Sequence, residues 1–321
     1  MNDKQQFYNE FYSALEKAME PSGGHLQKVD VPKNNSVKKG ITIKFDNVNI
    51  APTVYPDIYY PDWKSGHSMS DIVTGVRTEL MRTAPTMGQF TVNSLSRENA
   101  PNHLYAAVVN YENNKDWLKK IPHERIADLA VFAKWRFDPD NSYEVMAGKV
   151  TEPLLARLQL TKEEALKIAK TNTGRDASLE PISHAIMALA REDGTPEEII
   201  QAILKEADDP FYVLSNKTGI DGAALIADSH VLKQVHETLE ENFYILPSSI
   251  HEVLIVPESK ALTAEELKKL VFSVNREEVP VEDRLSDEVY KFDGHSLKLA
   301  GMDGLTEEHN ITDTIKHHRS R

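Results

Sequence analysis

Residues 209–257 read DPFYVLSNKTGIDGAALIADSHVLKQVHETLEENFYILPSSIHEVLIVP, and this stretch decides the predicted fold. It contains four apolar runs that are each about as long as one buried strand and are bounded by Pro, Gly, Asn or Ser. The runs are Phe211–Leu214, Ala223–Ile226, Phe243–Leu246 and Val253–Val256. Between the second and third runs, Asp228 or Ser229 caps a helix predicted over 229–241, whose apolar face carries Leu232, Val235 and Leu239. The pattern predicts an antiparallel β–β–α–β–β module.

The segments on either side of this stretch indicate further helices and strands. Near the N-terminus, Phe7, Phe11 and Leu15 share one face of a predicted helix, and strand-like runs follow it. Two capping boxes, Thr161 with Glu164 and Thr263 with Glu266, predict helix starts before and after the module. The sequence therefore predicts an α+β protein with an N-terminal α+β region (1–150), a helical connector (151–208), a β–β–α–β–β–α module (209–300) and a flexible polar tail (301–321).

Length and composition restrict the class of protein. The chain has 321 residues, of which 40% are hydrophobic, so it can bury a substantial core without cross-links. It contains no cysteine, which excludes disulfides, thiolate metal sites and thiol nucleophiles. The first residues lack the pattern of a secretory signal, and no run approaches about 18 consecutive apolar residues. These features predict a cytoplasmic location.

The charge balance bears on the choice of partner. The formal net charge of −13 results from 50 acidic and 37 basic residues distributed along the whole sequence. Because contacts to phosphates need a basic surface, this balance argues against direct binding of nucleic acid and against binding to an anionic membrane. The expected partner is a protein or a small molecule.

Three His–Glu pairs invite comparison with zinc proteases: His123–Glu124, His236–Glu237 and His251–Glu252. The zinc motif needs a second histidine four residues after the first, so that both imidazoles share a helix face, and none of the three pairs has one. No glycine-rich phosphate-binding motif is complete either. The sequence predicts no metal site and no cofactor.

The segment PSSIHE between the last two apolar runs carries the catalytic candidates Ser249, His251 and Glu252. A serine nucleophile needs a base within hydrogen-bonding reach, and His251, oriented by Glu252 or Asp221, has the right chemistry. Neighbouring residues on a strand point to opposite faces, however, so His251 and Glu252 share a pocket only if the turn extends past them. In the simpler interpretation, the serine hydroxyls hydrogen-bond the turn backbone.

The loop SNKTGIDG supplies candidates for ligand binding. Asn216, Lys217 and Asp221, together with Ser248 of the next turn, form a predicted polar rim. Gly219 and Gly222 permit positive φ or close approach of another backbone. A purely structural turn is the competing interpretation, because these residue types are typical of turns.

Several segments resemble one protein family. They are GITIKFDNVNIAPTVYPDIYY (40–60), AKTNTGRDASLEP (169–181), NKTGIDGAALI (216–226), FYILPSSIHEVLIVP (243–257) and LSDEVY (285–290). Over about residues 40–290 the chain resembles an uncharacterised bacterial family catalogued as domain of unknown function 5688. The resemblance implies a soluble intracellular protein, often carried on mobile elements, and it implies no activity and no set of site residues.

Three functions therefore stay open. We favour a non-catalytic binding or regulatory protein, because no complete nucleotide, metal or nucleophile motif is present. The first alternative is a hydrolase-like enzyme that uses the corner from Ser248 to Glu252. The second is an acidic decoy that binds a nucleic-acid-associated protein.

Overall fold

The computed structural model describes residues 3–45, 51–89, 95–137, 147–192, 194–206, 211–247 and 249–301. Its contacts divide the chain into two compact units, Met1–Ser96 and Arg97–Arg321. Both units combine helices with antiparallel sheets, which confirms the predicted α+β class. The predicted boundaries at residues 150, 208 and 300 stay predictions. The predicted polar tail lies outside the described residues except for Gly301.

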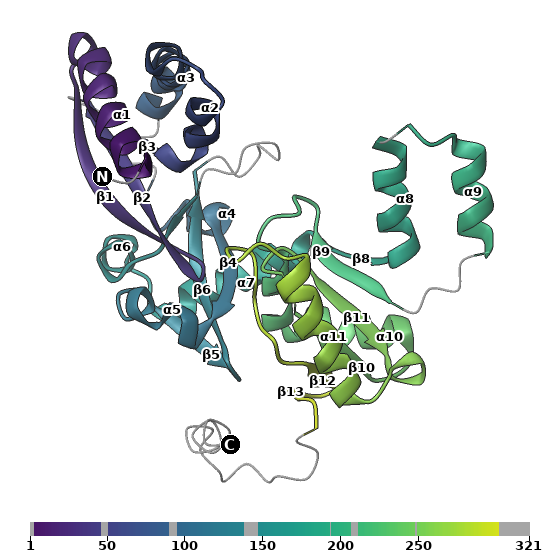
Figure 1. Cartoon of the computed structure of the whole chain (residues 1–321). Coiled ribbons are helices and arrows are strands. Elements are labelled where there is room, and N and C mark those ends of the chain that lie inside the picture. The colour runs from purple at the N-terminus through teal and green to yellow at the C-terminus, as the bar shows by residue number, and fades with distance from the viewer. Residues whose placement is uncertain are drawn as a thin grey trace, which may run out of the picture. The chain divides into compact units, whose positions relative to one another are not determined.

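The first unit packs helices on a small sheet. Its elements are α1 (Asp3–Met19), η1 (Glu20–Ser22), β1 (Gly24–Lys33), β2 (Ser36–Phe45), β3 (Thr53–Val54), η2 (Pro56–Tyr59), α2 (Tyr60–Lys64) and α3 (Met69–Gln89). The sheet order is β1–β2–β3, with both pairs antiparallel. Figure 1 shows α1 running alongside the long β1–β2 hairpin.

The core of the first unit follows the helical period of its sequence. Phe7, Phe11 and Leu15, the predicted apolar stripe of α1, are fully buried. They belong to the same core cluster as residues of the sheet and of α3, including Ile43 and Val76. Burial of side chains spaced three or four residues apart stabilises each helix mainly through tertiary packing.

The second unit contains two sheets and more helices. Its helices and 3₁₀ turns are α4 (Ala100–His103), α5 (Tyr111–Leu118), α6 (Glu152–Leu158), α7 (Lys162–Arg175), α8 (Ile182–Glu192), α9 (Glu197–Glu206), η4 (Gly222–Ala227), α10 (Ser229–Leu239), η5 (Glu258–Lys260) and α11 (Ala264–Glu277). Its strands are β4 (Leu104–Asn110), β5 (His123–Ile126), β6 (Leu129–Arg136), β7 (Ala147–Lys149), β8 (Ala177–Pro181), β9 (Tyr212–Asn216), β10 (Phe243–Leu246), β11 (Val253–Pro257), β12 (Tyr290–Phe292) and β13 (Leu297–Leu299).

Two antiparallel sheets organise this unit. In one, β6 lies between β4 and β5 and also pairs with β7. The other has six strands in the order β13–β12–β10–β11–β9–β8. Three of the four apolar runs predicted as strands are confirmed as β9, β10 and β11 of the six-stranded sheet. The predicted helical connector contains four helices and also β8, which forms one edge of that sheet.

The predicted strand Ala223–Ile226 is wrong, because these residues form the 3₁₀ helix η4. All four are buried, so the run is apolar on every side and has no periodicity that separates a strand from a helix. The backbone turns at Asp221, where φ is 58°. A Cβ on Gly222 would lie 2.3 Å from the carbonyl oxygen of His251, so only glycine permits this approach.

The helix after η4 is confirmed, with small differences at its face and its end. Asp228 caps α10 by accepting a hydrogen bond from the backbone of His230 at 2.9 Å. The buried residues of α10 include Leu232 and Val235, as predicted, whereas Leu239 is only half-buried. The helix ends before Glu240, whose positive φ of 58° stops it two residues earlier than predicted.

A carboxylate ties the two sheets of this unit together. Asp128, between β5 and β6, accepts hydrogen bonds from Ser286 Oγ at 2.7 Å and from Asn110 Nδ2 at 3.0 Å. The hydroxyl of Tyr290, on β12, also donates to Asp128. The side chain of Tyr290 is fully buried. A contact between residues about 160 positions apart therefore fixes β12 against the β5–β6 turn.

Candidate functional site

The predicted catalytic corner lies between β10 and β11. Ser249 is 6% exposed and forms an isolated antiparallel bridge with Arg284. Its hydroxyl oxygen accepts a hydrogen bond from the backbone N–H of His251 at 2.9 Å. This contact is typical of a serine that closes a turn on its own backbone. Ser248 lies outside the described residues.

The imidazole of His251 faces two aspartates. Nδ1 accepts a long hydrogen bond of 3.4 Å from the backbone N–H of Asp221, and Nε2 lies 3.4 Å from Asp283 Oδ1. In the neutral ring the proton is therefore on Nε2, which faces the carboxylate. Asp283 rather than Glu252 is the acid that orients this ring. Within the described part of the chain, the side chain of Glu252 makes no hydrogen bond or ion pair.

The loop that connects β9 to η4 is held by its own side chains. Asn216 donates from Nδ2 to the carbonyl oxygen of Ile220 at 2.8 Å, and its Oδ1 accepts from the backbone and the hydroxyl of Thr218. The Lys217 side chain is exposed, while its backbone N–H donates to the carbonyl oxygen of Asp176 at 3.1 Å. Asn216 thus shapes the loop, and Lys217 points to solvent.

Asp221, one of the predicted site residues, forms a salt bridge with Lys134. It is 5% exposed, and both of its carboxylate oxygens accept hydrogen bonds from Lys134 Nζ, at 2.8 and 2.7 Å. Lys134 lies on β6, so this ion pair joins the 216–221 loop to the other sheet of the unit. The structure therefore brings Asp221 and His251 together beside the turn of Ser249. Each of the three side chains forms a hydrogen bond with the backbone or an ion pair with a neighbouring side chain.

A cationic group at the end of β6 was not predicted from the sequence. Arg136 is 4% exposed, and its guanidinium stacks on the ring of Tyr105 at 3.8 Å from the centroid. In the described part of the molecule, this guanidinium has no hydrogen bond and no ion pair. Lys134, two residues earlier on the same face of the strand, is already neutralised by Asp221. The available sequence signal was the pair of cations at the end of the apolar run Leu129–Ala133.

The surroundings of Arg136 make its charge costly. Burial lowers the pKa of its guanidinium, and the negative charges of Asp221 and Asp176 offset only part of that effect. The ring of Tyr105 also lines a pocket of about 480 Å³, together with Asn102, His103, Arg175 and Asp176 among others. Arg136 itself does not line this pocket and is connected to it through the ring of Tyr105. A buried cation is a position where an anionic group lowers the free energy.

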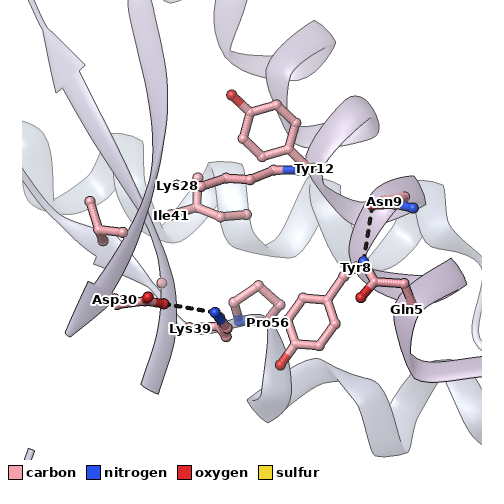
Figure 2. Close-up of a pocket in the computed structure, with 11 residues that line it drawn as sticks. Gln5, Tyr8, Asn9, Tyr12, Lys28, Asp30, Lys39, Ile41 and Pro56 are labelled. Atoms are coloured by element: carbon pink, nitrogen blue, oxygen red, sulfur yellow. Dashed lines mark hydrogen bonds and ion pairs between the residues drawn. The ribbon is translucent and has the colours of Figure 1, made fainter. Parts of the chain in front are cut away.

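A second concave surface lies in the first unit, between α1 and the β1–β2 hairpin (Figure 2). We call it the α1–β1 groove; its volume is about 410 Å³. Side chains of α1, including Tyr8 and Tyr12, face Lys28 and Asp30 of β1 across it. The stripe of Phe7, Phe11 and Leu15 predicts the helix, and no pattern in the sequence indicates this surface.

Neither a membrane-spanning helix nor a cluster of metal ligands is present among the described residues. No helix among them combines the length and the apolar character that crossing a membrane requires. No group of three or more His, Asp and Glu side chains in the described ranges has the arrangement needed to hold a metal ion.

The fold and the sites define a two-unit α+β protein with a structured polar corner, a buried cation stacked on a tyrosine and a helix–hairpin groove. The chain belongs to the family of unknown function DUF5688, whose model matches residues 4–294. No curated protein and no solved structure matches it. The resemblance expected from the sequence is therefore confirmed, and it now includes α1.

Proposed function

We propose that this chain is a non-catalytic binding protein of the cytoplasm, and that Arg136 contacts an anionic group of its ligand. The observation that carries the proposal is the guanidinium of Arg136, which is 4% exposed and lacks a hydrogen-bond or ion-pair partner in the described structure. A planar guanidinium stacked on an aromatic ring binds carboxylate or phosphate in a bidentate manner. The ligand's charge replaces the partner that this buried cation lacks.

The geometry of the corner supports binding over hydrolysis. A serine nucleophile requires its hydroxyl to donate to a base, and within the described structure the Ser249 hydroxyl makes no hydrogen bond to a ring nitrogen of His251; its oxygen accepts from the backbone N–H of that residue. The ring nitrogens of His251 face Asp221 and Asp283 instead. A fluorophosphonate probe is the direct test of the alternative. Labelling of Ser249 that disappears in His251→Ala would establish a nucleophile and contradict the proposal.

The binding step is tested by titrating the full chain with inorganic phosphate and with acetate. We expect at least one of these anions to raise the midpoint of thermal unfolding of the wild type through its affinity for the folded state. Arg136→Met keeps a long apolar side chain and removes the charge. We expect this variant to lose the anion effect while its stability without ligand stays equal to or above that of the wild type, since an unpaired buried charge is removed.

Arg125→Met is the matched control. Arg125 also stacks on a tyrosine, at 3.7 Å from the centroid of Tyr111, but it is exposed and donates to the carbonyl oxygen of Ala127 at 3.1 Å. We expect this variant to respond to the anions as the wild type does. If the anions raised the unfolding midpoint of the Arg136→Met variant as much as that of the wild type, Arg136 would be excluded as the contact. If they raised the midpoint of none of the three proteins, the anion site would be rejected.

A further inference from the structure

The free edge of β1 is defined by the hydrogen-bond register of the hairpin. β1 is the outer strand of its sheet, and Leu26 pairs with Ile43 of β2. The backbone N–H of Ile43 donates to Pro52 at 2.9 Å, on the side away from β1. Leu26 and Ile43 are therefore a non-hydrogen-bonded pair, and the N–H and C=O of Leu26 point away from β2. The direction of the backbone groups reverses at each residue of a strand. Lys28 and Asp30 are two and four residues after Leu26, so their N–H and C=O groups also point away from β2.

Only part of this edge is satisfied. The hydroxyl of Tyr12 donates to the carbonyl oxygen of Leu26 at 3.2 Å, which agrees with the direction derived from the register. Pro32, the next outward residue after Asp30, has no N–H to offer. The outward N–H and C=O groups of Lys28 and Asp30 have no partner in the described part of the chain. An edge with such groups is a template for another strand.

The α1–β1 groove lies beside this edge. In Figure 2 the side chains of Gln5, Asn9 and Tyr12 face the strand that carries Lys28 and Asp30. A groove bounded by a helix and by a free strand edge is the geometry in which an extended peptide adds to a sheet: backbone hydrogen bonds supply affinity, and alternate side chains supply specificity. A nucleic-acid backbone lacks the alternating N–H and C=O groups that this edge matches.

The charges of the hairpin select the kind of peptide. Residues 24–45 contain five lysines and one acidic residue, Asp30, in a protein whose net charge is −13. Asp30 is paired with Lys39 at 2.9 Å. The ammonium of Lys28 lies 4.4 Å from the centroid of the Tyr12 ring, and in the described structure it has no carboxylate partner. A carboxylate on the incoming strand provides the missing partner.

We propose that the α1–β1 groove binds an extended acidic segment of a partner protein, which adds to β1 as a fourth strand. Its backbone pairs with Lys28 and Asp30, and its carboxylate side chain lies opposite Lys28. Residues two positions apart on a strand share a face. The peptide side chain two positions from the carboxylate therefore lies over the groove, beside Tyr8 and Pro56. The inference is independent of the anion contact at Arg136, which lies in the other unit.

The test uses the full chain and a fluorescein-labelled pool of octapeptides with Glu or Asp at every second position and uncharged residues elsewhere. Fluorescence anisotropy should show saturable binding to the wild type. Asp30→Pro removes an outward N–H without touching the β2 ladder, and Asp30→Ala, the control, removes the same carboxylate but keeps the N–H. We expect the proline variant to bind at least about tenfold more weakly than the alanine variant, because only the proline variant loses the main-chain hydrogen bond from residue 30 to the peptide.

The charge is tested separately. Lys28→Glu should weaken binding by about tenfold or more, and Lys17→Glu, an exposed lysine near the end of α1, should change it by less than about twofold. Amide hydrogen exchange at Lys28 and Asp30 should slow when the pool is bound. Absence of saturable binding, or equal affinities for the Asp30→Pro and Asp30→Ala variants, would overturn the proposal. Binding of an oligothymidylate in place of the peptides, sensitive to Lys28→Glu, would assign the groove to nucleic acid instead.

Discussion

At the scale of single residues, Asp128 is a carboxylate whose pKa depends on its burial between the two sheets. Burial raises its pKa above 3.8, while hydrogen bonds from Tyr290 and Ser286 favour the charged form and offset part of this effect. The same burial, with the charge of Asp128 beside it, raises the pKa of Tyr290. The contact that fixes β12 against the β5–β6 turn therefore depends on protonation.

We predict that this dependence is visible in the free energy of unfolding. Below pH 3.8 both the folded and the unfolded chain carry the proton on Asp128. As the pH rises above 3.8, the unfolded chain ionises first, and stability is lost until the folded pKa is passed. Urea titrations between about pH 4 and pH 8 should show that wild type loses stability relative to Asp128→Asn as the pH rises.

Asp116→Asn is the control with the opposite sign. The hydrogen bond from Lys119 lowers the pKa of Asp116, an exposed carboxylate, so its contribution is present above pH 3.8 and is lost as the pH falls. If the free energy of unfolding of the wild type and of the Asp128→Asn variant changed in parallel over the whole pH range, Asp128 would have the same pKa in the folded and the unfolded chain.

At the scale of elements, short side-chain motifs define helix ends more clearly than apolar runs define strands. Thr161 and Glu164 form the predicted capping box at the start of α7, and Thr263 and Glu266 form the one at the start of α11. Each box satisfies backbone N–H groups that the helix itself leaves unpaired. These contacts span three residues, so distant parts of the chain have little influence on them.

We predict that Thr161→Ala lowers the free energy of unfolding by about 0.5–2 kcal/mol, because the first turn of α7 loses the acceptor for the N–H of Glu164, now at 3.1 Å. Thr171→Ala provides the comparison within the same helix. Thr171 is exposed in the helix interior, where alanine has the higher helix propensity, so this variant should be as stable as wild type or slightly more stable. Chemical denaturation measures the free energy of unfolding of both variants. Equal losses in the two would mean that the Thr161 cap makes no specific contribution to stability.

At the scale of the whole molecule, the two units differ in charge. Residues 1–96 contain ten Lys and Arg and ten Asp and Glu, so the entire net charge of −13 belongs to residues 97–321. The first unit also has its own core, which α1, the sheet and α3 supply together. The net charge of the full sequence therefore describes neither unit, and it does not reveal that the β1–β2 hairpin of the first unit is basic.

We predict that a core substitution acts on the unit that contains it. Phe11 is fully buried in the first unit, and Phe243 is fully buried in the second. Truncation of either to alanine should cost about 3–5 kcal/mol in its own unit. Hydrogen exchange of the full chain should then show faster opening of amides within 1–96 for Phe11→Ala and within 97–321 for Phe243→Ala. Uniform acceleration in both variants would show that the chain unfolds as one cooperative body.

The sequence by itself determined the α+β class, the apolar face of α1, the helix caps and three strands of the six-stranded sheet. These features depend on local periodicity and on hydrogen bonds between near neighbours. The run Ala223–Ile226 became η4 because Gly222 packs against the carbonyl oxygen of His251, about thirty residues away. A buried apolar run of four residues has no local signal that separates these outcomes.

Only the tertiary structure decided what the site residues do. The sequence placed Ser249, His251 and Asp221 near one another as candidates, but hydrogen-bond direction and the ion pair with Lys134 show how each is used. Among the residues that the structure describes, Arg136 has no charged partner and Lys28 and Asp30 of β1 have unpaired outward backbone groups. Neither feature was predictable, because whether a charge or a backbone group is paired depends on residues that folding brings together across the chain.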